Sequence, residues 1–516
     1  QFDWSMASDL GPPLLIDRDE VTTSVRALES GKNVVLAGDF GNGKTLTARM
    51  IKSRLASQGF DVYVAGEFDS AQHSDLELLA KRDKTSFVLI DSFELNMELI
   101  EHYCVLAPKN VKLLLCARTS AVERTRKQLR EWGLDFIEMP VDELSTTEIS
   151  RLIDVFDNAG LWGDLASMSP ALKAERIYHK NRRQISLSLL EILDAPQVKA
   201  RVAGLLRSLL ADPSQKATVF AIAVLEILDA PTNISLVSEI AGNNAIYEPK
   251  LRSNENFQSI FKLHGSSVKT KSSLFALSIV RGHFTAPYVV DELLRVVDKF
   301  NAERNYAREK YLIFKNLLKF SVIERMLPGA STDQKKANLA KYYEELKRRV
   351  SWLKTDPHYW LQYAMAQINF GDYGPAQKYL DQAYALARSR QGYHTEQFDT
   401  QQARMWLEMS AKSDESKESY RHFAAAHDLL KKVPSDLHKY WQYARYAEVY
   451  EKQYVNYTKG SAAGFEQSVK NAVAEMNLSL GKGALSGVDM IPTKRIAERL
   501  EKVVEAMKSA RSPGSN

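Results

Sequence analysis

The chain has little cysteine, few helix-breaking residues and no long apolar run. Only two of its 516 residues are cysteines, Cys104 and Cys116, which excludes a disulfide-stapled scaffold and fits a reducing cytosol. Glycine and proline number 24 and 16, a low share that favours helix. No apolar run approaches the roughly 18 residues that a membrane helix needs, and no signal peptide is evident. We therefore expect a cytoplasmic, helix-rich protein that does not enter a membrane.

The chain also lacks a strong excess of either charge. It carries 69 basic and 64 acidic residues, a net charge of +5, so nucleic acid is not an expected partner. Hydrophobic residues make up 45% and charged residues 26%, which is typical of folded proteins and excludes a mainly disordered chain. At roughly 100–200 residues per domain, the length predicts about three or four domains.

The first 140 residues alternate short β-rich runs with helical stretches. Runs that are largely apolar and separated by helices are typical of parallel strands buried on both faces of a sheet. The sequence therefore predicts an α/β domain with five strands, at Asn33–Ala37, Asp61–Ala65, Ser86–Asp91, Val111–Ala117 and Leu134–Met139.

From about Pro140 onwards the sequence is mainly helical. Ser145 and Glu148 have the spacing of a capping box that opens a helix over Leu144–Ala159. Residues 256–280 contain a candidate β-hairpin among helices. In the last third, Tyr359–Ala387 has the spacing of a tetratricopeptide repeat, and a related phrase returns at Tyr440–Ala444. This pattern predicts an α-solenoid, and a helical bundle with aromatic core positions is the alternative.

We divide the chain into six segments on this basis. They are an N-terminal segment, a P-loop NTPase core, a helical lid, a winged-helix-like region, a tetratricopeptide-like helical array and a flexible tail, predicted at residues 1–30, 31–140, 141–210, 211–330, 331–508 and 509–516. The predicted fold class is a multidomain α/β plus α protein.

One segment matches the phosphate-binding P-loop pattern G-x-x-x-x-G-K-[ST] in full. It follows a predicted strand and precedes a predicted helix, the position that the motif requires. Its glycines let the backbone wrap a phosphate, its lysine reaches the β- and γ-phosphates, and its threonine hydroxyl binds Mg²⁺. We expect ATP or ADP with Mg²⁺ to bind Gly38, Asp39, Phe40, Gly41, Asn42, Gly43, Lys44, Thr45 and Leu46.

A second acidic position follows the apolar run Phe87–Ile90. The run delivers Asp91 to the carboxyl end of a strand, where parallel sheets bind ligands, so Asp91 is the expected Walker B carboxylate for Mg²⁺. The alternative is that Asp91 caps the next helix. Hydrolytic P-loop enzymes often place Glu directly after this Asp, but Ser92 stands there, and the nearest carboxylate is Glu94. We therefore expect slow hydrolysis, with Glu94 as the candidate catalytic carboxylate.

A strand between the two motifs and another after them match the additional-strand division of P-loop proteins. The later strand, Val111–Ala117, ends at Arg118. An arginine at this strand tip points at the γ-phosphate and reports whether it is present. The alternative is a surface arginine in a loop.

The first 300 or so residues resemble the STAND class of signal-transducing P-loop NTPases, through GDFGNGKT, LIDS and LLLCARTS. The resemblance implies that Asn181–Leu190 lies near the nucleotide. It also implies that His283 or Arg281, at the end of a winged-helix region, contacts the β-phosphate of ADP. A structural histidine is the alternative, and a clear Gly-x-Pro motif is missing.

The resemblance also implies a function. The chain would be a switch that binds a protein trigger, for example a phage protein, through its C-terminal repeats and self-associates on binding ATP. In bacterial antiviral members an N-terminal effector domain, often sirtuin-like or a nuclease, supplies the output. No such domain precedes Gly38, and because the first residue is Gln rather than Met, we expect the effector upstream of Gln1 or in a separate protein.

Two other functions remain open. One is a motor ATPase of the AAA+ kind that acts on protein or nucleic acid, which the small net charge and Ser92 disfavour. The other is a STAND-type transcription regulator, but the helical stretch at residues 217–242 is not basic.

Overall fold

The structure is a computed structural model that describes residues 15–66, 71–270, 272–302, 308–329, 331–481 and 487–511. It forms two compact units, which are described separately. The first comprises Gln1–Thr285 and Ala307–Ile313, and the second comprises Ala286–Tyr306 and Phe314–Asn516. The predicted N-terminal segment, up to residue 14, and the end of the predicted tail lie outside the described residues.

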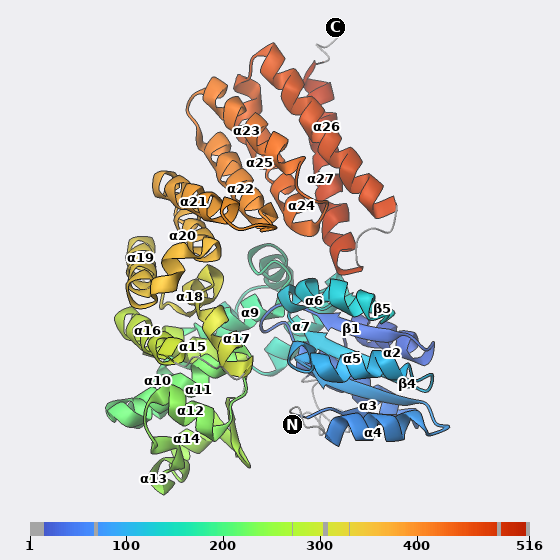
Figure 1. Ribbon diagram of the computed structural model, residues 1–516, viewed down its shortest axis with the longest axis vertical. Coiled ribbons are helices and arrows are strands. Elements are labelled where there is room, and N and C mark those ends of the chain that lie inside the picture. Colours follow the sequence, from blue (N-terminus) through green and yellow to red (C-terminus); the bar gives the residue numbers. More distant parts are fainter. Residues whose placement is uncertain are drawn as a thin grey trace. The chain divides into compact units, whose positions relative to one another are not determined.

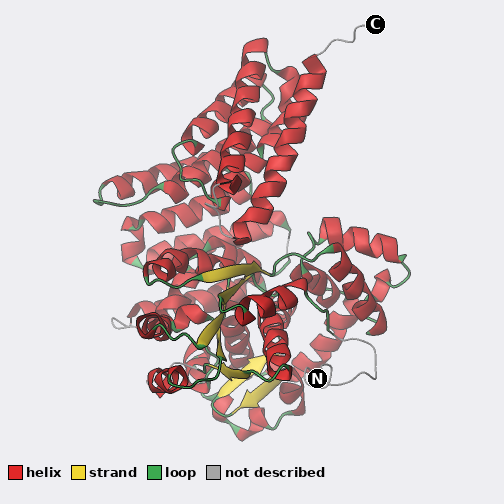
Figure 2. Ribbon diagram, turned by 90° about the vertical axis from the view of Figure 1, so that its right-hand side faces the viewer, coloured by secondary structure: helices red, strands yellow, loops and turns green. Residues whose placement is uncertain are grey.

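The first unit contains a parallel five-stranded sheet with strand order β2-β3-β4-β1-β5 (Figures 1 and 2). Strand β4 lies between β1, which leads into the P-loop, and β3, which ends at Asp91. This is the additional-strand arrangement that the sequence predicts. Strands β1, β3 and β4 have the predicted bounds, β2 is one residue shorter, and β5 is shifted; the five span Asn33–Ala37, Asp61–Val64, Ser86–Asp91, Val111–Ala117 and Phe136–Pro140.

Helices cover both faces of the sheet. Helices α2 and α3 share a core with one set of alternate strand residues, which includes Val34, Leu36 and Leu114. Strands β1, β3 and β4 are buried on both faces because they are almost entirely apolar, as the sequence predicts. The helices around the sheet are α2 (Asp19–Glu29), α3 (Lys44–Ser57), α4 (Ala71–Ala80), α5 (Met97–Leu106) and α6 (Thr119–Glu131).

A helical lid follows the sheet. It opens with the predicted capping box, in which the Ser145 hydroxyl accepts from the Glu148 backbone N–H and the Glu148 carboxylate accepts from the Ser145 N–H. Its small core contains Leu152, Phe156 and Trp162. The lid consists of α7 (Thr146–Asn158), the 3-10 turn η2 (Gly163–Leu165), α8 (Pro170–Glu175), the π-helix η3 (Arg176–Lys180), α9 (Ile185–Leu193) and α10 (Pro196–Ala211).

The remainder of the first unit is organised around α11, which is buried along most of its length and packs against α12 and α15. The predicted β-hairpin is confirmed as the antiparallel pair β6–β7. The elements are α11 (Pro213–Leu228), α12 (Ile234–Ala241), η4 (Ala245–Tyr247), α13 (Pro249–Arg252), α14 (Glu255–Ile260), β6 (Phe261–His264), β7 (Ser267–Thr270) and α15 (Ser273–His283).

The second unit is helical throughout its described residues. The predicted repeat is an antiparallel helix pair, α20–α21, in which buried Ala364, Ala376 and Ala383 let the two helices approach. A second pair, α22–α23, follows (Figure 1). The helices are α16 (Ala286–Ala302), α18 (Phe320–Met326), α19 (Thr332–Arg349), α20 (Pro357–Asn369), α21 (Tyr373–Arg388), α22 (Glu396–Lys412), α23 (Ser416–Leu430), α24 (Leu437–Ala444), α25 (Tyr446–Gln453), α26 (Lys459–Gly481) and α27 (Gly487–Arg511), and α17 (Arg308–Leu317) spans the unit boundary.

Two boundaries differ from the predicted ones. The second unit begins with α16, well before the predicted residue 331, because α16 packs against α19. An ion pair between Asp298 of α16 and Arg349 of α19 also joins the two helices. Helix α27 continues to Arg511, so Ser509 is helical rather than part of a tail. No helix among the described residues is both long and apolar enough to cross a membrane.

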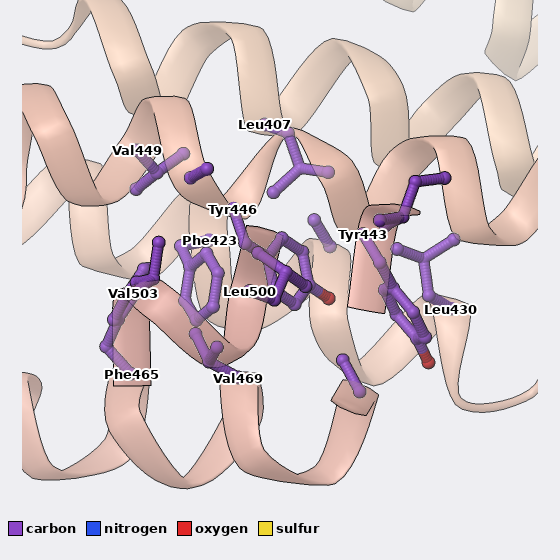
Figure 3. Close-up of a cluster of buried hydrophobic side chains, with 14 of the residues drawn as sticks. Leu407, Phe423, Leu430, Tyr443, Tyr446, Val449, Phe465, Val469, Leu500 and Val503 are labelled. Atoms are coloured by element: carbon purple, nitrogen blue, oxygen red, sulfur yellow. The ribbon is translucent and has the colours of Figure 1, made fainter. Parts of the chain in front are cut away.

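Aromatic side chains form much of the core of the second unit. Tyr443 of α24 and Tyr446 of α25 are buried with Phe423 of α23 and Phe465 of α26 (Figure 3). Most aromatic side chains named here therefore belong to the core. Trp352 and Trp441 are about half-exposed.

Candidate nucleotide site

The P-loop connects β1 to α3. Gly41 and Gly43 have φ angles of 79° and 87°, in the left-handed region that favours glycine. A Cβ on Gly38 would lie 2.6 Å from Cγ2 of Val141, so glycine is required there by close packing. Lys44 begins α3, and its Nζ donates to the backbone oxygen of Asp39 at 3.1 Å. The loop thus presents a helix N-terminus and a lysine, the chemistry that suits a phosphate.

Thr45 and Asp91 meet at the carboxyl edge of the sheet. The Thr45 hydroxyl donates to Oδ2 of Asp91 at 2.9 Å, and the Ser92 N–H donates to Oδ1 at 3.0 Å. Burial raises the pKa of Asp91; the Thr45 hydrogen bond lowers it, and the Asp229 carboxylate raises it further. A buried carboxylate with another acid nearby is a favourable position for a cation.

The described residues fit Mg²⁺ held together with a nucleotide. No cluster of three or more His, Cys, Asp or Glu side chains that could hold a metal occurs among them. Thr45 and Asp91 supply one hydroxyl and one carboxylate, and Mg²⁺ is commonly bound by one or two such groups, substrate phosphates and water.

Glu94 and Leu46 also lie in this region. Glu94 is in the one-turn helix η1 (Phe93–Leu95), directly after Asp91 and Ser92. The pKa of the Cys116 thiol is raised first by burial, then by Asp91 and also by Glu94, so both acids lie near this residue of β4. Leu46 is on the first turn of α3 and is partly exposed. A catalytic role for Glu94 and a contact between Leu46 and nucleotide stay predictions.

Arg118 follows β4 at the same edge of the sheet. Its Nε donates to Oδ2 of Asp229 at 3.3 Å, and its Nη2 donates to the backbone oxygen of Ile227 at 2.9 Å. The guanidinium lies over the ring of Phe40 in the P-loop, 5.6 Å from the centroid. Arg118 is therefore not a free surface arginine, because it joins the sheet edge to the end of α11.

Asp142 is a P-loop partner that the sequence reasoning missed. Its Oδ1 accepts from the backbone N–H of Asp39 and, at 2.8 Å, from the Asn42 side chain. Its Oδ2 accepts from the Thr119 hydroxyl at 3.2 Å. Asn42 is fully buried, and its side-chain oxygen accepts from the backbone N–H of Ser186 at 3.1 Å. The available signal was the position of Asp142, two residues after the strand that neighbours β1.

Arg18 is a second residue that sequence reasoning missed. This buried arginine donates from Nε to Glu148 at 3.0 Å and from Nη2 to the backbone oxygens of Val141 and Glu143, each at 3.3 Å. These hydrogen bonds connect the segment before α2 to the start of the lid. A single Arg before a helix is common, so the sequence offered no signal.

Leu274, in the first turn of α15, packs on the P-loop. A Cβ on Gly41 would lie 2.5 Å from Cγ of Leu274, so glycine is required there.

His283 is nine residues further along α15 than Leu274, about 13 Å at 1.5 Å per residue. Its pKa is lowered by burial and then by Lys199 of α10. Arg281 lines a cavity in the lid instead of the P-loop. The role of either residue as a nucleotide sensor stays a prediction.

The chain matches no known family model and no curated protein. A Signal Transduction ATPase with Numerous Domains (STAND) protein with a tetratricopeptide repeat sensor, from Pyrococcus horikoshii, aligns over 96% of this chain and 79% of its own, with 13% identity and a TM-score of 0.29. The Thermotoga maritima RuvB Holliday junction branch migration motor aligns over 50% and 92%, with 16% identity and a TM-score of 0.23. The Aeropyrum pernix ORC1 protein, solved in complex with DNA, aligns over 53% and 94%, with 14% identity and a TM-score of 0.25. Similarity this low carries no functional argument.

The strand order and the P-loop themselves give this chain the fold of an additional-strand P-loop NTPase followed by a helical array.

Proposed function

We propose that this chain is an ATP-operated signalling switch of the STAND class. ATP–Mg²⁺ binds Gly38–Thr45 and Asp91, a protein trigger binds the C-terminal helical array, and the ATP-bound form self-associates to activate an effector. A role in bacterial antiphage immunity is part of this proposal. It rests on the motifs and on the placement of Arg118.

The observation that carries the proposal is the pairing of Arg118 with Asp229. Arg118 is at the tip of the strand between the P-loop strand and the Asp91 strand, where a γ-phosphate would lie. Its present partners, the Asp229 carboxylate and the Ile227 carbonyl, both belong to the end of α11. A γ-phosphate is a stronger competitor for a guanidinium than a half-exposed carboxylate, because it offers more charge and more acceptor oxygens.

This competition distinguishes the two nucleotides. ADP has no γ-phosphate and leaves the Arg118–Asp229 pair intact, whereas ATP takes Arg118 and releases the end of α11. A ligand shifts a conformational equilibrium only by its difference in affinity for the two states, and the γ-phosphate supplies that difference here. Asp229 also lies close enough to Asp91 to raise its pKa, so its withdrawal relieves repulsion beside the metal site.

The test uses Arg118→Ala and Asp229→Asn in the full chain, with Arg130→Ala as a control at an exposed position of α6. Binding of ADP and ATP with Mg²⁺ is measured by calorimetry, and self-association by light scattering. Arg118→Ala is expected to keep ADP affinity within threefold, to lose at least tenfold in ATP affinity, about 1.4 kcal/mol, and to lose ATP-dependent assembly. Asp229→Asn is expected to favour ATP over ADP relative to wild type.

Normal ATP-dependent assembly of Arg118→Ala would remove Arg118 from the mechanism. A wild-type chain that stays monomeric with every nucleotide and trigger would contradict the assembly model. Rapid turnover of many ATP per second, stimulated by a polymer, would instead favour the AAA+ motor. Lys44→Ala provides the site control, since ATP affinity should fall at least tenfold without the lysine that faces the phosphates.

A further inference from the structure

Five side chains form a strip across α22 and α24, two helices of the second unit that contact each other (Figure 1). Arg404, Glu408 and Lys412 follow one another at intervals of four residues along α22, which places them on one face of that helix. Trp441 and Arg445 have the same spacing at the end of α24. Arg445 Nη1 is 3.2 Å from Oε1 of Glu408, and this ion pair joins the two faces. We call these five residues the α22–α24 strip.

A single carboxylate serves both arginines of the strip. Oε1 of Glu408 accepts from Nε of Arg404 at 3.0 Å and also pairs with Arg445. The other oxygen, Oε2, accepts from the Tyr373 hydroxyl at 3.3 Å. Nη2 of each arginine has no acceptor within the described part of the chain. Glu408 therefore neutralises only one of the two guanidinium charges.

Lys412 adds a third positive charge. Its Nζ donates to the Tyr373 hydroxyl at 2.8 Å and lies 5.2 Å from the centroid of that ring. The neighbouring acid, Glu448, already accepts from Lys452 at 2.7 Å. That hydrogen bond lowers the pKa of Glu448, and Arg445 and Lys412 lower it further, so the Glu448–Lys452 pair borders the strip. The strip and this pair together hold four basic and two acidic groups, which leaves a surplus of positive charge.

The positive groups of the strip are accessible to a ligand. The side chain of Arg445 is 31% exposed and that of Arg404 is 18% exposed, and Lys412 is an exposed residue. Burial lowers the pKa of Arg445; Glu408 raises it, and the charge of Arg404 lowers it again. Two like charges that lie close together in a partly desolvated place repel each other. A second anion beside them would relieve this repulsion.

Trp441 supplies an apolar surface beside these charges. Its side chain is 44% exposed, and the ring of His438 meets it edge-on with the centroids 5.2 Å apart. Trp441 is one helical turn before Arg445, so one ligand can contact both side chains. Tryptophan and arginine are the residue types most enriched among those that dominate the binding energy of protein interfaces.

We propose that the α22–α24 strip binds an acidic linear segment of a partner protein. Its carboxylates contact Arg404, Arg445 and Lys412, and a neighbouring apolar side chain packs on Trp441. Charge complementarity selects this occupant, because the planar fork of an arginine makes two parallel hydrogen bonds to a carboxylate. The inference rests on the proposed function, in which the helical array binds a protein trigger, and it specifies the chemistry of that trigger.

The experiment measures binding of the fluorescein-labelled peptide EEELEEE to the nucleotide-free full chain by fluorescence anisotropy. QQQLQQQ lacks the charges, and EEEAEEE lacks the large apolar side chain. Arg445→Gln and Lys412→Gln each remove a cation, Glu408→Gln removes the acid, and Trp441→Ala removes the ring. Arg421→Gln is the control, since Arg421 is a 70% exposed arginine of α23 that pairs with Glu418. Each variant is first checked for folding by circular dichroism.

Wild type and Arg421→Gln are expected to bind EEELEEE at least tenfold more tightly than QQQLQQQ, with an affinity that falls as salt is added. Arg445→Gln and Lys412→Gln should each weaken EEELEEE at least threefold. Trp441→Ala should weaken EEELEEE and leave EEEAEEE unchanged. Glu408→Gln should tighten EEELEEE at least threefold, whereas a merely structural role of Glu408 would weaken it. If Arg445→Gln does not fold, Lys412→Gln and Glu408→Gln decide the matter.

The proposal is overturned if wild type fails to bind EEELEEE at millimolar concentration, if it binds QQQLQQQ equally well, or if Glu408→Gln weakens the acidic peptide. Tighter binding of a single-stranded oligonucleotide of equal charge would also overturn it, because the strip would then select phosphates. A nucleotide-free dimer that Trp441→Ala dissociates would overturn it in favour of a second copy of the chain.

This test is independent of the nucleotide switch, because the peptide is measured without nucleotide. A chain that assembles with ATP but does not bind the peptide contradicts only the acidic-segment proposal. A chain that binds the peptide but never assembles contradicts only the proposed function.

Discussion

The charged carboxylate of Asp91 lowers the stability of the nucleotide-free protein. Its pKa is raised chiefly by burial and also by Asp229, despite the Thr45 hydrogen bond. A raised carboxyl pKa means that the folded chain binds the proton more tightly than the unfolded chain. Stability therefore falls as pH rises through the folded pKa, and the cost is fully present above that pKa. Such a cost is expected where a cation offsets it on binding.

Replacing Asp91 by Asn removes the charge and keeps an oxygen that accepts from Thr45. We expect the free energy of unfolding of the nucleotide-free protein at pH 7 to rise, because the buried charge is gone. Mg²⁺-dependent tightening of ATP should disappear while binding without Mg²⁺ survives. Urea unfolding and calorimetry with and without Mg²⁺ test the two effects in the same variant. An unchanged Mg²⁺ dependence would move the Walker B role to another residue.

The sequence predicted the position of those site residues that belong to a local motif. The P-loop and Asp91 belong to this group, because a short pattern after a strand specifies both the backbone shape and the chemistry. Asp142 was missed because its partners Asp39, Asn42 and Thr119 are each 23 or more residues away. A lone Asp after a strand carries no mark of such contacts.

At the scale of elements, α23 and α25 show how polar groups are accommodated in the aromatic core. His427 of α23 is buried, and its Nδ1 is 2.9 Å from the hydroxyl of Tyr446 at the start of α25. Burial, with a smaller contribution from Lys431, lowers the pKa of His427 to about 4. An unfolded histidine titrates near 6.5, so between about pH 6.5 and pH 4 the unfolded chain binds more protons than the folded one.

Acid is therefore expected to destabilise this helical core. The free energy of unfolding should fall by about 2 kcal/mol from His427 alone between pH 7 and pH 5, where the unfolded state takes up the proton and the folded state does not. Urea titrations of wild type and His427→Gln at both pH values measure the difference. His394→Gln, at a highly exposed position, is the matched control and should behave as wild type. Equal pH dependence of wild type and His427→Gln would contradict the assignment.

Element boundaries show a similar division between local and distant causes. The capping box at Ser145 was predicted because Ser and Glu three residues apart satisfy each other's N–H groups locally. The π-helix at Arg176–Lys180 was not predicted, since its sequence, RIYHK, is compatible with an ordinary helix. The ion pairs of Arg176 and Lys180 with Glu191 and the packing of Ile177 in the lid accompany the conformation, and they depend on α9.

At the scale of the whole molecule, the chain forms two units with separate cores. One core lies between the sheet and helices α2 and α3, and another lies among α22 to α27. We therefore expect the units to respond differently to nucleotide, since a ligand stabilises the folded unit that binds it.

Scanning calorimetry should show two unfolding transitions. ATP–Mg²⁺ at about 100 times its Kd should stabilise the P-loop unit by about 2.7 kcal/mol and raise the midpoint of its transition, leaving the other midpoint unchanged. Phe423→Ala, in the core of the second unit, should lower the other midpoint and so assign it. A single transition that ATP moves as a whole would show that the units unfold together.

The sequence by itself determined the strands β1, β3 and β4, the P-loop, the acid at the end of β3 and the helical hairpin of residues 357–388. These features depend on periodicity and on motifs a few residues long, so neighbouring residues suffice to specify them. Only the tertiary structure decided that Arg118 pairs with Asp229, that Leu274 covers Gly41, and that Trp162 and Arg281 line one cavity. Each of these joins residues more than 100 positions apart. Such residues come together only when complete helices and strands pack, so no local sequence pattern predicts these contacts.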